Sequence, residues 1–395
     1  MMVLSSAPPW LKSNTNNFPL TLCACAKKCY NNIHMKSHDG KVLARIGRRI
    51  RACDYLVVAQ LFLQSDFLLE QPLVPDDIKP RLLGHWGTCH GINVAYANLR
   101  AYFSKEQQIT HPVSKPQKSA QTINPFAVGA KLVETEEAEP DTSVVDPNFS
   151  FILGPGHGFP ALQANLFIDG DLEKVDSKAK RDASGIAYVC RNFSWPDGFP
   201  SHASPFTPGV ICEGGELGYA LGAAYGYVLG HPERTVAVML GDGELETATA
   251  LSSLNLVKLV GNHRAHGQVI PVLHLNGYKI SAPTLYGRKS ERELHELVRG
   301  FGYTPVAIHG DSAEVFQDAL DRAAKYEHPF LILRTEKGAT GPQEVNGRKV
   351  AGNYLAHQIP LPDAKTNPDE LKALQKWLES YHFTELFNSE KGFTL

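Results

Sequence analysis

Short apolar runs alternate with amphipathic runs along most of the chain. Nearly continuous apolar runs predict strands within residues 151–158, 235–240, 269–277, 303–310 and 329–338. Apolar residues at spacings of three and four predict helices within residues 49–63, 91–103, 160–168, 219–229, 251–260 and 291–302. Strands that are apolar on both faces and alternate with helices are typical of a parallel sheet covered on both sides. The pattern therefore predicts an α/β fold with a parallel sheet flanked by helices.

Two stretches lack this pattern and set the expected domain limits. The first 38 residues contain no Asp or Glu, and residues 105–148 are polar, rich in proline and poor in aromatic side chains. Segments of this composition bury too little apolar surface to offset the conformational entropy lost when they become ordered. We therefore predict a disordered tail at 1–45, a domain at 46–388 with a disordered insertion at 105–148, and a short tail at 389–395.

The start of the chain also bears on where the protein works. Its Lys and Ser residues are weakly similar to an organellar transit peptide, but it lacks an amphipathic face. A disordered tail, or a later start at Met35, accounts for the composition better. We therefore expect a cytoplasmic protein.

Charge and cysteine usage exclude several other classes of protein. The 395 residues carry a formal net charge of -2, so nothing favours nucleic acid or an anionic membrane surface as a partner. No apolar run approaches the ~20 residues of a membrane-spanning helix. The seven cysteines show no paired spacing, which predicts a reducing compartment. Cys23, Cys25 and Cys29 cluster, but no second Cys or His pair follows at zinc spacing.

Two of the expected strands end in residues that can bind a metal ion. VAVMLGDGELET at 236–247 stops at Gly-Asp-Gly, and the next strand ends at Asn276, 34 residues after Asp242. This distance fits one strand–helix–strand crossover, so the ends of the two strands can lie side by side. Ligands of such sheets bind outside the carboxyl ends of the parallel strands. A carboxylate and an amide oxygen suit Mg²⁺, which completes its shell with phosphate and water. An Asp in such a turn is more often only a turn residue, but the second strand end and the glycine-rich loop at 213–218 favour a metal site.

The spacing of GDG and the later Asn also resembles the thiamine-diphosphate-binding motif. Eight motifs occur in the order found in phosphoketolases, from about residue 50 to 388: LLGHWGTCHG, FILGPGHGFPAL, SHASPFTPGV, EGGELGYALG, GDGELET, LHLNGYKI, LRTEKGATGP and AHQIPL. The resemblance implies an aldehyde-lyase that splits xylulose 5-phosphate or fructose 6-phosphate with inorganic phosphate. The products would be acetyl phosphate and an aldose phosphate. SHASPFTPG and LLGHWGT argue against another thiamine-dependent enzyme such as a transketolase.

The resemblance assigns a role to individual residues. The expected Mg²⁺ ligands are Asp242, Asn276 and the backbone carbonyl of Tyr278. The residues expected around the diphosphate are Gly215, Gly243, Glu244 and Tyr278. The expected catalytic residues are His85, His157, His202, His357 and Lys337. Histidines can move protons between sugar hydroxyls near neutral pH, and lysine or histidinium can neutralise phosphate groups.

Several positions depart from the family pattern. Phe159 stands where a second glycine is usual, and its bulk is expected to narrow the substrate channel. His90 replaces a proline, and Glu336 and Ala339 stand where proline and tryptophan are expected. None of these changes removes a predicted ligand or histidine.

Phosphoketolases also continue into a second cofactor-binding domain, for which this sequence has no matching segment. That domain supplies the glutamate that hydrogen-bonds the aminopyrimidine ring of the cofactor. We therefore expect the chain alone to be inactive and to be a fragment or one part of a split enzyme. A homo-oligomer or hetero-assembly would supply the second domain. The alternative is a catalytically silent paralogue that binds and regulates a full-length phosphoketolase.

Overall fold

The computed structural model describes residues 38–104, 148–205, 207, 210, 213–260, 266–390 and 392–395. Residues 1–37 of the predicted tail and residues 105–147 of the predicted insertion lie outside this described part. The cysteine cluster at 23–29 lies outside it too. Among the helices in these ranges, none is both long and apolar enough to cross a membrane.

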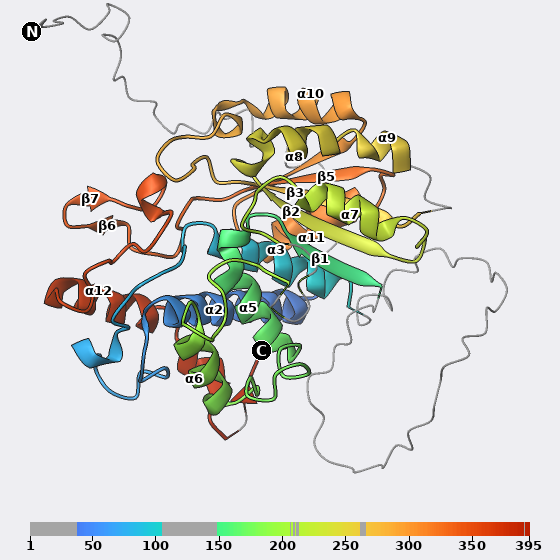
Figure 1. The fold of residues 1–395 in the computed structure, drawn as a ribbon. Helices are drawn as coiled ribbons and strands as arrows, with labels where there is room; N and C mark the ends of the chain where they lie inside the picture. The colour runs from blue at the N-terminus through green and yellow to red at the C-terminus, as the bar shows by residue number, and fades with distance from the viewer. Residues whose placement is uncertain are drawn as a thin grey trace, which may run out of the picture. The chain divides into compact units, whose positions relative to one another are not determined.

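A parallel sheet forms the centre of the fold (Figure 1). Within the described residues it has five strands, in the order β1-β2-β3-β5-β4. The strands are β1 (Phe149–Leu153), β2 (Thr235–Gly241), β3 (Gln268–Leu275), β4 (Thr304–His309) and β5 (Pro329–Arg334). Each neighbouring pair is parallel. The predicted parallel sheet is therefore confirmed.

Helices cover both faces of this sheet, because the side chains of each strand alternate between them. In β2, Val236 and Val238 belong to one apolar cluster, whereas Ala237 and Met239 belong to the other. The helices of the first cluster are α7 (Ala220–Val228), α8 (Ala248–Ser253), α9 (Leu256–Val260) and α10 (Glu291–Phe301). Those of the second are α2 (Gly40–Phe62), α3 (Cys89–Tyr102), α5 (Phe159–Asp169), α6 (Ala183–Asn192), α11 (Ala313–Ala323) and α12 (Pro368–Glu379). Figure 1 shows the two groups on opposite sides of the sheet.

Short elements fill the connections, and several of them carry predicted site residues. The 3₁₀ helices are η3 (Pro75–Asp77), η4 (Gly156–Gly158), η5 (Glu244–Glu246), η6 (Tyr286–Arg288), η7 (Tyr354–Ala356) and η8 (Phe383–Glu385). Two small hairpins pair β6 (Glu344–Val345) with β7 (Arg348–Lys349), and β8 (Phe387–Asn388) with β9 (Gly392–Phe393). His157 lies in η4, and His357 follows η7 directly.

Both ends of the described domain reach beyond the predicted limits. Helix α2 begins at Gly40, before the expected start at 46, because the Asp39 carboxylate accepts the Lys41 N–H at 2.8 Å and caps it. At the other end, β9 pairs with β8, and Phe393 packs on Phe387 with ring centroids 5.0 Å apart. Residues 392 and 393, placed in the predicted tail, therefore belong to the fold.

Candidate functional site

The loops after β2 and β3 touch at the carboxyl end of the sheet. Asp242 follows β2, and Asn276 follows β3. The N–H of Gly277 donates to Asp242 Oδ2 at 2.7 Å. Gly241 is paired in register with His274, so the two strands end at nearly the same level. The structure therefore brings the two loops that carry the predicted metal ligands into direct contact.

Three donors hold the Asp242 carboxylate in place. The N–H of Gly243 donates to Oδ1 at 2.9 Å, while Gly277 N–H and the Thr284 hydroxyl donate to Oδ2 at 2.7 and 3.0 Å. The side chain is buried, with 3% of its surface exposed. Burial raises the pKa of Asp242, whereas these hydrogen bonds and the charge of Lys337 lower it. A buried carboxylate held in this way gains stability from a cation beside it.

Lys337 places a positive charge at the third predicted ligand. Its Nζ donates to the Tyr278 carbonyl oxygen at 2.8 Å, and its side chain is 2% exposed. Burial lowers the pKa of Lys337 to about 8, although Asp242 raises it. The carboxylate of Asp242, the amide oxygen of Asn276 and this carbonyl are the oxygen donors that a hard divalent cation takes. By donor type alone, this set suits Mg²⁺ bound to a diphosphate, with the Lys337 ammonium already on one of the three oxygens.

Glu244 joins three loops from inside the site. Its carboxylate accepts the N–H groups of Gly241 and Gly218 at 3.0 and 3.2 Å. A Cβ atom on Gly154 would lie 2.4 Å from Glu244 Oε2. Burial raises the pKa of Glu244 to about 7, and the two hydrogen bonds lower it. Glu244 thus fixes the loop that precedes α7 against the end of β2.

The glycine loops at 154–158 and 213–218 cross with their backbones in contact. A Cβ atom on Gly156 would lie 2.1 Å from the Gly214 carbonyl oxygen, so only glycine permits this approach. Ala203 N–H donates to the Gly156 carbonyl at 2.9 Å, and Gly214 N–H donates to the Ala203 carbonyl at 2.8 Å. Gly215, the next residue, is exposed, and its N–H donates to Glu213 Oε1 at 3.0 Å. The crossing of the two loops is therefore closely packed at Gly156 and Gly214, while Gly215 lies at the surface.

The four predicted catalytic histidines form one cluster. The ring centroid of His85 lies 5.1 Å from that of His157, 5.3 Å from that of His202 and 5.1 Å from that of His357. His157 and His357 are 5.0 Å apart by the same measure. The four rings come from four separate loops, so their convergence is a property of the fold and not of sequence proximity.

Burial lowers the pKa of all four rings and so favours their uncharged form. It lowers the pKa of His85 to about 4, that of His357 to about 3 and that of His157 well below its ordinary value, and neighbouring positive groups lower them further. Burial also lowers the pKa of His202. Histidinium, which the sequence led us to expect, therefore requires a bound anion to stabilise it. Nδ1 of His85 and Nδ1 of His357 are buried and have no hydrogen-bond partner within the described ranges.

His274, which sequence reasoning did not single out, connects three segments of the site. It is buried on β3, two residues before Asn276. Its Nδ1 lies 3.0 Å from Thr88 Oγ1, and its Nε2 lies 2.7 Å from Thr335 Oγ1. Thr88 precedes α3 and Thr335 follows β5, so His274 fixes their spacing. The one signal in the sequence was a polar residue inside an otherwise apolar strand.

Two departures from the family pattern have structural explanations. Phe159 is fully buried in the core beside Phe193, with ring centroids 6.3 Å apart, so it does not narrow a channel as we expected. His90 Nδ1 lies 2.7 Å from Asp54 Oδ2, and its Nε2 lies 3.1 Å from Asp311 Oδ2. Burial alone lowers the pKa of His90, but the two carboxylates raise it to about 10. This ion pair links α2, α3 and the loop after β4.

Comparison with known sequences gives a match along most of the chain. A family model described as the XFP N-terminal domain matches residues 37–130, 143–324 and 317–394. A protein named "Probable phosphoketolase" from Bradyrhizobium diazoefficiens is 38% identical over 366 residues, which cover 87% of this chain and 41% of the relative. Another of that name from Streptomyces avermitilis is 39% identical over 361 residues, 86% of this chain and 40% of the relative. The chain spans about two fifths of the length of these curated relatives.

Solved structures with a similar fold include transketolases. The enzyme from Leishmania mexicana has a TM-score of 0.53 and 16% identity, covering 89% of this chain and 46% of its own. That from Campylobacter jejuni has a TM-score of 0.54 and 16% identity, covering 87% of this chain and 43% of its own. At this identity the likeness concerns the fold alone. It confirms the predicted class, a thiamine-diphosphate-binding fold.

Proposed function

The chain belongs to the phosphoketolase family, and from that membership we propose that it forms the diphosphate-binding part of a site that uses thiamine diphosphate and Mg²⁺. The observation that carries the proposal is the contact between the ends of β2 and β3. There the buried Asp242 lies beside the loop of Asn276 and Tyr278, and Lys337 lies on the Tyr278 carbonyl.

In this proposal the oxygen donors hold the cofactor, and the loops keep them in position. Asp242, Asn276 and the Tyr278 carbonyl would hold Mg²⁺, which in turn binds the diphosphate. Glu244 keeps the adjoining glycine loops together through Gly218 and Gly241. When bound, thiamine diphosphate would supply the nucleophilic carbon and the electron sink that cleavage of a ketose carbon–carbon bond requires.

The proposed substrates are xylulose 5-phosphate or fructose 6-phosphate together with inorganic phosphate. The products would be acetyl phosphate, an aldose phosphate and one molecule of water. The histidine cluster supports this chemistry, because neutral rings can accept protons from sugar hydroxyls and return them. The Nδ1 atoms of His85 and His357, which have no hydrogen-bond partner among the described residues, support this proposal. Lys337 supplies a buried positive charge that can neutralise a phosphate.

We propose that turnover belongs to an assembly larger than this chain. The curated relatives carry more than half of their length outside the match. The remaining region would be supplied in the same polypeptide or by a partner, and it would provide the group that acts on the aminopyrimidine ring. An assembly that binds the cofactor but forms no acetyl phosphate would favour the alternative role of a regulatory paralogue.

The central test is Asp242→Ala, with the exposed Asp76→Ala as a matched control. Calorimetric titration with thiamine diphosphate, with Mg²⁺ or with a chelator, measures binding independently of turnover. Loss of supporting residues around a metal ligand already weakens binding about 10- to 100-fold, so we expect a loss of about 100-fold or more. Unchanged Mg²⁺-dependent affinity in Asp242→Ala would remove the site. Acetyl phosphate formation by the assembly, with each ketose phosphate in turn, tests the reaction.

A further inference from the structure

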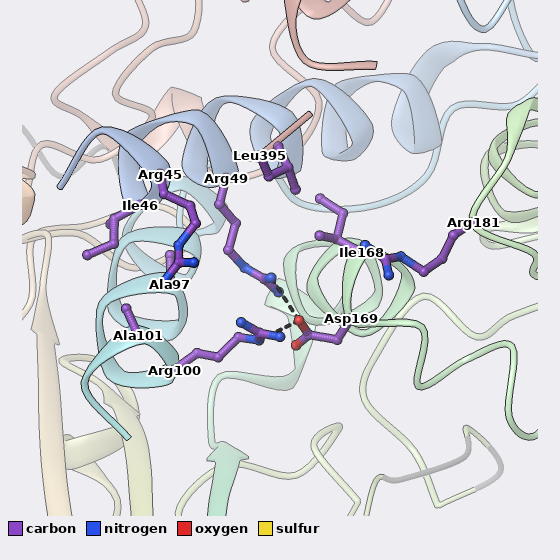
Figure 2. Close-up of a pocket in the computed structure, with 10 residues that line it drawn as sticks. All are labelled: Arg45, Ile46, Arg49, Ala97, Arg100, Ala101, Ile168, Asp169, Arg181 and Leu395. Carbon is purple, nitrogen blue, oxygen red and sulfur yellow. Dashed lines mark ion pairs between the residues drawn. The ribbon is translucent and has the colours of Figure 1, made fainter. Parts of the chain in front are cut away.

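A small cavity lies where α2, α3 and α5 meet near the start of α6 (Figure 2). Its volume is about 50 Å³. Four arginines and one acid are among the residues that line it: Arg45 and Arg49 from α2, Arg100 from α3, Asp169 from α5, and Arg181 from the segment before α6. Of these five side chains only Asp169 is acidic, so basic groups dominate the polar lining. Leu395 also lines the cavity, and Arg45 and Arg100 make further interactions.

The one carboxylate is already engaged. Asp169 Oδ1 lies 2.7 Å from Arg49 Nη1 and 2.5 Å from Arg100 Nε, and the Tyr96 hydroxyl donates to Oδ2 at 2.9 Å. Arg181 extends its side chain toward the same space (Figure 2). Its Nε is buried and has no hydrogen-bond partner in the described part of the chain. A buried donor without a partner is costly, so an acceptor bound in the cavity within reach of this atom would be stabilised.

Packing of helix ends explains only part of this arrangement. The carbonyl end of a helix attracts cations, and both α3 and α5 end at the cavity. That attraction accounts for Arg100, which lies in the last turn of α3. Arg49 is held by Asp169 and by Asn165 Oδ1 at 3.3 Å. Neither interaction satisfies the buried Nε of Arg181.

We propose that this cavity binds a phosphate dianion, either free or as the phosphate group of a small monoester. Guanidinium groups present planar pairs of donors that match phosphate oxygens. One water needs roughly 10–15 Å³ of such a cavity, so about 50 Å³ admits a group of only a few heavy atoms. Apolar neighbours such as Ile46 and Ile168 limit the site to a compact anion.

This cavity is separate from the proposed catalytic histidine cluster. Helix α3 begins soon after His85 and reaches Arg100 near its other end, and α5 begins just after His157 and ends at Asp169. At 1.5 Å per residue, ten residues of helix span about 15 Å. The cavity and the histidine cluster therefore lie at opposite ends of the same two helices.

The experiment measures phosphate binding in a Lys337→Met background, in which we expect weaker phosphate binding at the proposed catalytic site. Calorimetric titrations use inorganic phosphate and glycerol phosphate, with chloride at equal ionic strength as the reference. Arg181→Met is then added, and Arg292→Met on α10, which is 86% exposed, serves as the matched control. A charge-assisted hydrogen bond accounts for about tenfold or more in affinity, so Arg181→Met should weaken phosphate binding by at least about tenfold, and Arg292→Met should leave it unchanged.

Folding is checked by circular dichroism and by melting without phosphate. If Arg181→Met does not fold, Arg181→Lys keeps the charge, loses the planar fork and should bind phosphate more weakly than the Lys337→Met parent. The proposal is overturned if the Lys337→Met chain binds neither phosphate species, or if binding is the same with and without Arg181. In that case the arginines only hold helix ends together. Stronger binding of glycerol phosphate than of inorganic phosphate would identify a monoester as the ligand. Asp242→Ala should leave phosphate binding at this cavity unchanged. Failure of the phosphate proposal can therefore be told apart from failure of the proposed function.

Discussion

Replacing His90 with glutamine is expected to remove much of the alkaline pH dependence of the free energy of unfolding. His90 is 5% exposed and lies between the carboxylates of Asp54 and Asp311. Glutamine can keep one hydrogen bond to Asp54 but cannot carry a charge. The variant therefore leaves the buried Asp54 carboxylate with neutral donors in place of a charged one: the new glutamine amide and Asn93 Nδ2, which lies 2.7 Å from Oδ1.

The size of the effect follows from the pKa of His90. A rise from 6.5 in the unfolded chain to about 10 in the folded protein corresponds to about 5 kcal/mol, at 1.36 kcal/mol per pH unit. The Asp311 side chain is 59% exposed, so solvent weakens that half of the interaction. Breaking a buried ion pair costs about 3–5 kcal/mol. We therefore expect His90→Gln to lose about 3 kcal/mol of stability at pH 6.

The direction of the pH dependence is fixed by the sign of the shift. Because the folded pKa of His90 is raised, its contribution is fully present below pH 6.5 and is lost as pH rises toward 10. The pKa of Asp311 is lowered by its hydrogen bond to His90, so that part is lost only in acid, as the carboxylate becomes protonated. The difference between wild type and His90→Gln should therefore be largest near pH 6 and shrink steadily by pH 10.

Urea denaturation at pH 6, 8 and 10 measures this difference directly. Other groups that titrate in the alkaline range are common to both proteins and cancel in the comparison. The exposed His231→Gln serves as the control and should follow wild type at each pH. A wild-type minus His90→Gln difference that stays constant from pH 6 to pH 10 would refute the ion-pair assignment.

Two further changes test the packing around the site. Gly156→Ala should destabilise the protein and weaken cofactor binding, because the new Cβ would lie 2.1 Å from the Gly214 carbonyl oxygen. Calorimetry measures cofactor binding and thermal melting measures stability. The control is Gly226→Ala on α7, because a Cβ atom at Gly226 would have no neighbouring atom within 4 Å. This control should stabilise the protein by about 0.5–1 kcal/mol. Phe159→Ala should cost about 3–5 kcal/mol in urea denaturation, because it leaves a cavity in the core. Equal stability of Phe159→Ala and wild type would contradict its placement there.

The strands and most helices could be predicted because local patterns specify them. The five apolar runs become β1 to β5, and the helices expected at 91–103 and 160–168 appear as α3 and α5. The helix expected at 251–260 is instead divided into α8 and α9. Asn255 lies at the break, and its side-chain amide donates to the Ser252 carbonyl at 3.2 Å, which competes with the helical pattern. The strand order was not predictable, because it depends on contacts between distant segments.

Some residues of the candidate site could likewise be predicted from the sequence, and others could not. Asp242 and Asn276 could be proposed because each follows an apolar strand that the sequence already indicates. The histidines could be named only through their motifs, since no spacing relates His85 to His357. His274 and the ion pair of His90 escaped notice because both act through partners supplied by other elements. Burial, which sets the charge of the histidine rings, becomes visible only once the chain is folded.

The in-register pairing of Gly241 with His274 has an evolutionary consequence. The distance between the two proposed metal ligands is set by neighbouring strands about 4.8 Å apart, and not by the length of any loop. A deletion of one residue within β2 or β3 would draw its ligand back by about 3.3 Å and turn alternate side chains to the wrong face. Insertions between α3 and β1, where 105–147 lie, change nothing in that pairing. Homologous chains should therefore vary freely in length between α3 and β1 while keeping β2 and β3 free of gaps.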